Sequence, residues 1–155
     1  DDVFLDLGCG DGRVVTNIAQ LCKCRAFGVD IRPECIASSQ ARADQGGPLV
    51  ATLCTFALTD FQQMQAGVDA PTFPAGLAGV TVIFTYLLPE PMRVLNDLLQ
   101  TAVLHQGVRL VTFMAHPHGE VWTSQGVSNT RDLLGELQLW ERTSKHTCDV
   151  GSASS

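Results

Sequence analysis

The stretch Phe4-Leu5-Asp6-Leu7-Gly8-Cys9-Gly10-Asp11-Gly12-Arg13 decides the fold of this chain. The apolar run over residues 3–5 predicts a buried strand with the acidic Asp6 at its carboxyl end. Glycines at positions 8, 10 and 12 then predict a turn whose backbone a ligand can approach closely. Apolar residues at helical spacing follow. A helix should therefore begin near Gly12 and point its free N–H groups at whatever lies above the turn.

Two classes of cofactor bind to such a turn, and Asp6 and Arg13 discriminate between them. A dinucleotide site has its third glycine at the position of Arg13, where a long side chain does not suit close packing of helix and strand. A pyrophosphate gains little from the carboxylate of Asp6, whereas an ammonium group gains a great deal. S-adenosylmethionine carries an ammonium group, a sulfonium and no phosphate. The residues favour this cofactor, and an ordinary strand–helix turn is the alternative.

Residues 6–12, with the two acids Asp6 and Asp11, resemble motif I of the class I S-adenosylmethionine-dependent methyltransferases. The resemblance implies an α/β, Rossmann-like methyltransferase fold with a mostly parallel seven-stranded sheet and an antiparallel last strand. It also implies S-adenosylmethionine as the cofactor and methyl transfer as the activity. The cofactor-binding residues that we expect are Asp6, Gly8, Cys9, Gly10, Gly12, Asp30, Ile31, Thr59, Asp60 and Thr85.

The second and third predicted strands carry the remaining acids of this set. Asp30 ends the strand predicted over residues 25–30, near the distance from the turn at which a carboxylate accepts hydrogen bonds from ribose hydroxyls. Ile31 would then form an apolar wall for the adenine. Asp60 follows the strand predicted over residues 49–55 and resembles the family's acid at the adenine amino group. A solvated acid is the alternative for Asp30, and a helix N-cap for Asp60.

Strands and helices alternate along the chain, which predicts a parallel sheet with right-handed crossovers. Helices are expected from near Gly12, from Pro33 toward Ala43, and from Pro89 to just before Gln106-Gly107. A loop-rich insertion is expected over residues 62–79, and a polar loop with a short helix ending at Leu133-Leu134 before the last strands. The strands are expected over residues 3–5, 25–30, 49–55, 80–86, 108–115, 137–143 and 146–150.

The most apolar strand, residues 80–86, should be central and buried on both faces. Tyr86 ends it and is the candidate catalytic residue, because its ring could line the acceptor channel and its hydroxyl could bond an acceptor amine. A packing tyrosine is the alternative. The chain lacks the N-P-P-Y or D-P-P-Y tetrad of methyltransferases acting on nucleobase amines and glutamine amides. Residues 84–89 and the glycine turn resemble the small protein-lysine methyltransferases related to the ATP synthase c subunit enzyme, although Arg32 replaces that group's asparagine.

The composition restricts the class of protein. At 155 residues, 45% of them hydrophobic, the chain suits one domain, which we interpret as a methyltransferase catalytic core over residues 1–155 that lacks its N-terminal segment. The net charge of −6 gives no strong nucleic-acid signal, and no apolar run is long enough for a membrane span. An intracellular protein, cytoplasmic or mitochondrial, is expected.

The cysteines and histidines do not predict a metal site. The six cysteines lack the spacing of a disulfide framework or a zinc site, so free thiols are expected. His116 and His118 lack a third ligand at useful spacing. They would be loop histidines or, alternatively, general bases. Trp122 and Trp140 are expected to pack in the core rather than to stack on a base.

The expected reaction is N-methylation of a protein lysine, so a protein substrate is the expected partner. An RNA or small-molecule methyltransferase on the same fold is one alternative, because a fold does not determine its substrate. A non-catalytic cofactor-binding partner subunit is another. An oxidoreductase is disfavoured by Arg13.

Overall fold

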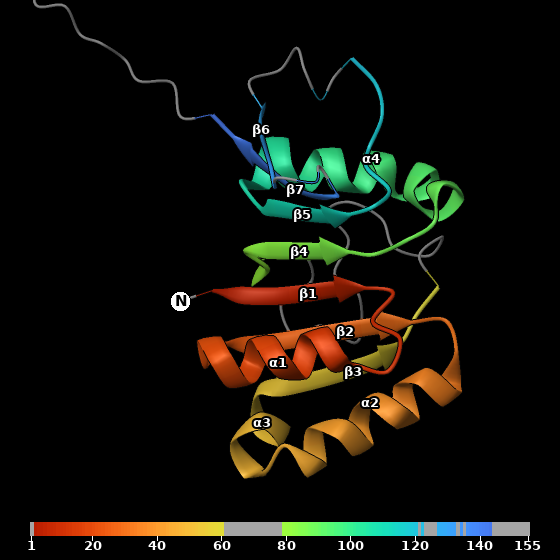
Figure 1. Cartoon of the computed structure of the whole chain (residues 1–155), viewed down its shortest axis with the longest axis vertical. Helices are drawn as coiled ribbons and strands as arrows, with labels where there is room; N and C mark the ends of the chain where they lie inside the picture. The colour runs from red at the N-terminus through yellow and green to blue at the C-terminus, as the bar shows by residue number, and fades with distance from the viewer. Residues whose placement is uncertain are drawn as a thin grey trace, which may run out of the picture.

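The computed structural model describes residues 2–60, 79–120, 122, 127–132, 134 and 136–143, which form a sheet with helices on both faces (Figure 1). The strands are β1 (Val3–Leu7), β2 (Arg25–Asp30), β3 (Cys54–Leu58), β4 (Val82–Thr85), β5 (Arg109–Phe113), β6 (Val127–Arg131) and β7 (Leu137–Arg142). The helices are α1 (Arg13–Cys22), α2 (Pro33–Gln45), α3 (Pro48–Leu53) and α4 (Pro89–Gln106).

The sheet has seven strands in the order β3-β2-β1-β4-β5-β7-β6. The strands β1 to β5 pair in parallel, and β7 runs antiparallel to both of its neighbours, β5 and β6. This confirms the predicted mostly parallel seven-stranded sheet with an antiparallel last strand. The strand order reverses at β1 and β4, and ligands of open α/β sheets bind at the carboxyl ends of the strands at such a point.

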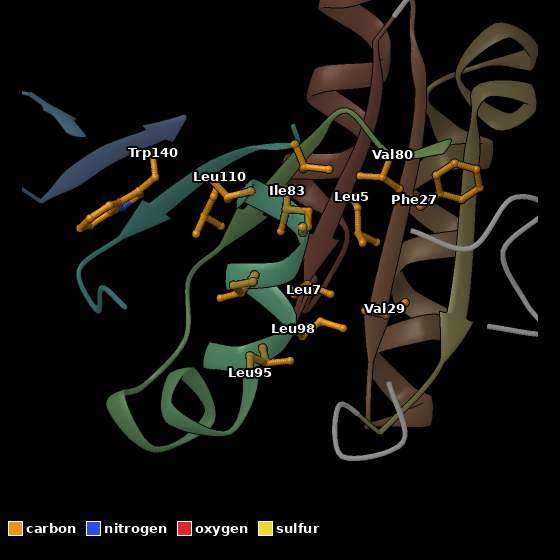
Figure 2. Close-up of a cluster of buried hydrophobic side chains, with 14 of the residues drawn as sticks. Leu5, Leu7, Phe27, Val29, Val80, Ile83, Leu95, Leu98, Leu110 and Trp140 are labelled. Atoms are coloured by element: carbon orange, nitrogen blue, oxygen red, sulfur yellow. The ribbon is translucent and has the colours of Figure 1, made fainter. Parts of the chain in front are cut away.

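Side chains alternate along β1 and feed two hydrophobic cores on opposite faces of the sheet. Leu5 and Leu7 belong to the larger core, which includes the buried side of α4 and is drawn in Figure 2. Phe4 belongs to the smaller core, which contains Val15 of α1. Asp6 lies on the same face as Phe4. This alternation therefore puts a carboxylate on the α1 side of the sheet.

The helices predicted at Pro33 and Pro89 are confirmed, but the strand predicted over residues 49–55 is wrong over residues 49–53. Residues 48–53 form α3, and β3 begins only at Cys54. Pro48 occupies the first turn of α3, where its missing N–H costs nothing, and the buried Val50 packs in the smaller core. This packing outweighs the strand preference of the β-branched residues in the segment.

The polar loop predicted after His118 is also wrong in part, because it contains β6. This strand pairs with β7 at the edge of the sheet, and the Asn129 side chain donates a hydrogen bond to Gln138 at 3.0 Å. An exposed edge strand needs no apolar alternation, so residues 127–131 carry no strand signal. Leu134 lies in a turn rather than a helix. The strand expected over residues 146–150 and residues 61–78 of the insertion lie outside the described residues.

The strand β4 is shorter than predicted and is not buried on both faces. Ile83 is fully buried beneath α4, whereas Val82 and Phe84 on the opposite face are half-buried. On this α1 side, the described residues leave an apolar groove of about 360 Å³ over β4. The groove is lined by Asp2, Phe4, Val14, Ile18, Cys22, Cys24, Val82, Phe84 and Val111. Among the described helices, none combines the length and apolarity needed to cross a membrane.

Candidate cofactor site

A cavity of about 480 Å³ opens at the carboxyl ends of β1, β4 and β5, beside the glycine turn. The turn supplies backbone to one wall, and aromatic rings from the ends of β4 and β5 form the other. The cavity is lined by Asp6, Gly8, Cys9, Gly10, Asp11, Arg13, Val14, Phe84, Tyr86 and Phe113. Four predicted cofactor residues therefore meet the predicted catalytic Tyr86 in one cavity.

The backbone of the glycine turn is left-handed at Gly10 (φ 54°) and Gly12 (φ 73°), a region that favours glycine. The two glycines serve different purposes. A Cβ added at Gly10 would meet nothing within 4 Å, so the chain is open to a ligand there. A Cβ added at Gly12 would lie 2.7 Å from the Cβ of Ser39, so Gly12 lets α2 pack against the turn.

Asp6 lies within β1, rather than just after it as predicted, and is 2% exposed. Among the described residues, burial and the charge of Asp30 act on its carboxylate and no hydrogen bond does, and the residue lines the cavity. Burial, and then the neighbouring charge of Asp30, raise the pKa of Asp6 to about 7. A buried carboxylate of this kind favours a cation that enters the cavity.

Asp30 ends β2 as predicted, is 5% exposed and already holds the loops around it. Its Oδ2 accepts a hydrogen bond from the Gly10 N–H at 3.0 Å, and its Oδ1 accepts one from the Arg32 N–H at 2.9 Å. Oδ1 also accepts from the Arg32 Nε at 3.3 Å, so the second lone pair of Oδ2 is the one with which Asp30 can still accept from a ligand hydroxyl. The Asp30 carbonyl accepts the Thr59 N–H at 3.0 Å, which brings Thr59 beside it at the same edge.

The other predicted residues near Asp30 are partly accessible. Ile31 is 61% exposed immediately after β2, a position from which it can cover a flat ligand. Asp60 is half-buried, two residues after β3.

The predicted role of the Thr85 side chain is not supported. Thr85 is fully buried, and its hydroxyl donates to the sulfur of Met92 in α4 at 3.5 Å. The residue pairs with Leu7 in the sheet, and both point toward the α4 core, away from the cavity. Phe84, one residue earlier, lines the cavity instead.

Tyr86 follows β4 and is 57% exposed, so it is not the end of a doubly buried strand. Its ring contacts Phe113 edge to face, with 5.0 Å between the ring centroids. The pair forms an aromatic wall at the mouth of the cavity, opposite the glycine turn.

Cys9 lines the cavity, but its thiol also packs in the smaller core beside Ser39, 3.9 Å from the hydroxyl. Burial raises the pKa of Cys9 to about 12, and the charge of Asp6 adds to this effect. The thiol is therefore protonated and is not a nucleophile at neutral pH. Cys9, Cys22, Cys24, Cys35 and Cys54 are free, and the described residues contain no cluster of three potential metal ligands.

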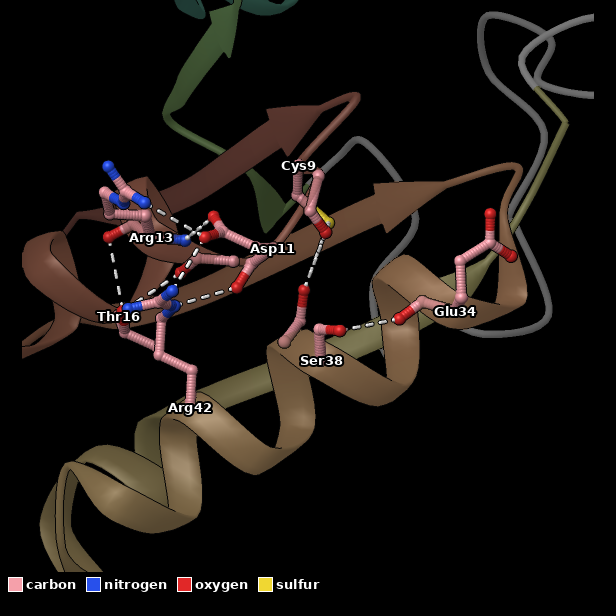
Figure 3. A network of polar contacts seen from close by, with 10 residues as sticks. Cys9, Asp11, Arg13, Thr16, Glu34, Ser38 and Arg42 are labelled. Atoms are coloured by element: carbon pink, nitrogen blue, oxygen red, sulfur yellow. Dashed lines mark hydrogen bonds and ion pairs between the residues drawn. The ribbon is translucent and has the colours of Figure 1, made fainter.

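Two residues of α2 that were not predicted, Ser39 and Arg42, hold the glycine turn from outside the cavity, and Figure 3 shows Arg42 beside Asp11. Ser39 is fully buried and donates to the Gly10 carbonyl at 3.0 Å. Arg42 donates to the Asp11 carbonyl at 3.0 Å and to the Asp11 carboxylate at 2.7 Å. Burial acts to raise the pKa of Asp11. The hydrogen bond from the Arg13 N–H and the charge of Arg42 outweigh burial, so the pKa of Asp11 is lowered. No local pattern in the sequence distinguishes Ser39 or Arg42 from other polar residues of the predicted helix.

His116, Trp122 and Trp140 do not line the cavity. The Trp140 indole N–H donates to the Thr112 hydroxyl at 3.1 Å, and that hydroxyl lies 2.7 Å from Nδ1 of His116. Trp122 and Trp140 are buried and contact each other edge to face at 5.5 Å. The prediction that the tryptophans pack in the core is confirmed.

Residues 4–100 match a family model described as a methyltransferase domain, and this span is more than half of the chain. No curated protein matches the chain significantly.

The solved structures that resemble this chain are mostly methyltransferases by their descriptions. An RNA methyltransferase from Salinibacter ruber, in complex with S-adenosyl-L-homocysteine, is 25% identical with a TM-score of 0.67, over 96% of this chain and 84% of that chain. Magnesium protoporphyrin IX methyltransferase from Synechocystis PCC 6803 is 16% identical with a TM-score of 0.61, over 91% and 74%. The ribosomal protein L11 methylase from Lactobacillus delbrueckii subsp. bulgaricus is 15% identical with a TM-score of 0.61, over 92% and 70%. The last two resemblances concern the fold alone.

Proposed function

The chain belongs to the methyltransferase domain family as a class I S-adenosylmethionine-dependent enzyme, and from this premise we propose that it methylates an aliphatic amine, the ε-amino group of a protein lysine. The single observation that carries the cofactor part of the proposal is the buried carboxylate of Asp6. The acceptor part rests on the aromatic wall of Tyr86 and Phe113 and on the resemblance of the glycine turn and residues 84–89 to the small protein-lysine methyltransferases.

The residues of the cavity fit S-adenosylmethionine. Asp6 is a buried residue on whose carboxylate no hydrogen bond acts among the described residues, and the ammonium group of the cofactor supplies both a charge and donors. The open backbone at Gly10 lets a ligand lie directly on the turn. Asp30 would accept a ribose hydroxyl with the remaining lone pair of Oδ2, and Ile31 would cover the adenine.

When bound, the cofactor supplies an electrophilic methyl group on a sulfonium, which is already a good leaving group. The residues of the chain then have to exclude water and orient the acceptor. Tyr86 and Phe113 would do this at the mouth of the cavity. Their rings desolvate an entering amine, and desolvation favours the neutral amine that carries the nucleophilic lone pair. The Tyr86 hydroxyl would accept a hydrogen bond from the amine and direct its lone pair toward the methyl group.

A labelled-methyl experiment tests this proposal. The protein is incubated with S-adenosylmethionine labelled in the methyl group and a lysate, and the label is followed after protease or ribonuclease treatment. We expect label in protein, recovered as methyl-lysine after hydrolysis. Label in another residue or in a small molecule would contradict the lysine assignment. No transfer to any fraction by a protein that binds the cofactor would indicate a non-catalytic binding subunit.

RNA is the second candidate acceptor, and one observation favours it. The Salinibacter ruber protein, described as an RNA methyltransferase, is similar over almost the whole length of this chain. The net charge of −6 weighs against extended phosphate contacts. Label that disappears on ribonuclease treatment and survives protease would support RNA and overturn lysine.

A further inference from the structure

We propose that Arg42, assisted by Ser39, is a positioning residue for the cofactor: from α2, outside the cavity, it sets the conformation of the glycine turn that the cofactor binds. This inference rests on the proposed function, because it concerns how the turn is prepared for S-adenosylmethionine. Arg42 is not part of the glycine-turn motif, because it lies 31 residues after Asp11 in the chain.

The contacts from α2 fall on three consecutive residues of the turn. Ser39 donates to the Gly10 carbonyl at 3.0 Å, and Arg42 donates from Nε to the Asp11 carbonyl at 3.0 Å. The Arg42 Nη2 also lies 2.7 Å from Oδ2 of Asp11. Gly12 packs so closely on Ser39 that any side chain would clash. The turn is therefore held through its carbonyl oxygens and not only through its glycines (Figure 3).

Holding a carbonyl oxygen also fixes the N–H of the next residue. In a trans peptide the C=O and N–H point in opposite directions, and the chain has no cis peptide among its described residues. Because the Gly10 carbonyl points to Ser39, the Asp11 N–H points away from α2. Within the described part of the chain nothing accepts a hydrogen bond from this N–H, and Asp11 borders the cavity. The contacts from α2 therefore leave the Asp11 N–H as a hydrogen-bond donor for the cofactor.

The same argument accounts for the second peptide of the turn. The Asp11 carbonyl points to Arg42, and the Gly12 N–H points back to the Cys9 carbonyl at 2.9 Å. On the other side, the Gly10 N–H is held by Asp30 at 3.0 Å. Without Arg42, the Asp11 carbonyl loses its partner from α2, and the peptide between Asp11 and Gly12 is held only by the Gly12 N–H bond to Cys9 and by the contacts of Arg13 with the Asp11 carboxylate. A left-handed turn that is not held samples other conformations, so part of the binding free energy would be spent on ordering it.

The test compares Arg42→Gln with a matched control, Arg109→Gln. Arg109 pairs with Asp2 at the opposite edge of the sheet, and its side chain is 42% exposed, against 39% for Arg42. Three quantities are measured for each variant: the affinity for S-adenosylmethionine by calorimetry, the hydrogen exchange of the Gly10 and Gly12 amides without ligand, and methyl transfer into lysate at limiting and saturating cofactor. Arg42→Lys is the conservative variant, because it keeps the charge but not the two-point contact.

We expect Arg42→Gln to weaken cofactor binding about tenfold, the effect of losing a charged hydrogen bond, and to speed exchange of the Gly12 amide by a similar factor. Transfer should fall at limiting cofactor and recover at saturation, Arg42→Lys should be intermediate, and Arg109→Gln should match the wild type. Unchanged affinity and exchange in Arg42→Gln would overturn the inference, as would an equal loss in Arg109→Gln. Fast exchange with unchanged affinity would also overturn it, because the turn would then be held for stability alone. A wild-type protein that binds no S-adenosylmethionine would overturn the proposed function itself.

Discussion

The two halves of the sheet differ in how their residues meet the cavity. In the half formed by β1 to β3, the polar groups at the cavity are mutually fixed: Asp30 holds Gly10, and Arg42 holds Asp11. In the half formed by β4 to β7, the cavity is bordered by the rings of Tyr86 and Phe113. The first half is built for one ligand of fixed chemistry, and the second presents an apolar opening.

This difference fits the task of a transferase with one constant and one variable ligand. The cofactor requires specific charge and hydrogen-bond partners, which buried polar groups supply only when they are held rigidly. An acceptor requires access, and exposed aromatic rings give contact area without a fixed pattern of donors. The comparison makes four predictions, in descending order of their expected effect on cofactor binding.

Removing the charge of Asp6 should have the largest effect on cofactor affinity. The change concerns only the half of the sheet formed by β1 to β3. In Asp6→Asn the cofactor ammonium loses its buried partner, and breaking such a pair costs about 3–5 kcal/mol, so affinity should fall at least about 100-fold. The free protein should become more stable at pH 8, because Asp6 there is a desolvated charge beside Asp30. Calorimetry and thermal unfolding of the same sample measure both effects. A variant that binds the cofactor normally would place its ammonium elsewhere.

The pKa of Asp6 near 7 gives the second prediction, a pH dependence that sharpens the comparison. A cation binds the ionised carboxylate, so as the pH falls below 7 the affinity for S-adenosylmethionine should drop by up to about tenfold per pH unit. The Asp6→Asn variant should lack this dependence, and a wild-type affinity that is flat between pH 6 and 8 would contradict it.

The stability of the free protein should change with pH in the opposite direction to the cofactor affinity, because it falls as the pH rises. The folded pKa of Asp6 lies above the ordinary value of 3.8. Between these two values the folded state binds more protons than the unfolded state, so the stability due to this group is full below about pH 4 and is lost as the pH rises to 7. Thermal unfolding of wild type and Asp6→Asn across this range isolates the contribution.

The first half could be predicted from the sequence in more detail than the second, and the reason is physical. Asp6 and Asp30 end up beside the cavity because each is tied to a strand and to a turn within a short stretch of chain. The orientation of Thr85 depends on the register between β1 and β4, in which Asp6 pairs with Phe84 and Leu7 with Thr85. No local pattern contains that register.

Long-range contacts and exposed edges were missed for related reasons. Arg42 lies in α2 and Asp11 lies in the glycine turn, so their contact forms only when α2 packs against the turn. The strand β6 is exposed at the sheet edge, so its residues carry no apolar signal. Pro48 directly precedes the strand predicted over residues 49–55, yet it begins another helix.

Tyr86 provides the last prediction, which has the smallest effect on cofactor binding and tests the second half. Tyr86→Ala removes the ring from the acceptor opening and leaves Phe113 in place, whereas Tyr86→Phe keeps the ring and removes only the hydroxyl. Because Tyr86 is 57% exposed, neither change opens a core cavity, and the melting temperature should stay close to that of the wild type. Under the proposed role, Tyr86→Ala should lower methyl transfer about tenfold at saturating cofactor, with cofactor affinity nearly unchanged.

The phenylalanine variant separates the two contributions of Tyr86. If the hydroxyl directs the amine, Tyr86→Phe should lose most of the activity that Tyr86→Ala loses. If the ring alone matters, by excluding water from the acceptor, Tyr86→Phe should retain nearly full activity. Transfer rate, cofactor affinity and melting temperature are measured on all three proteins, so that a loss of folding is not mistaken for a loss of chemistry. Full activity in a well-folded Tyr86→Ala protein would show that the acceptor does not pass this aromatic wall, and the division between a cofactor half and an acceptor half would have to be redrawn.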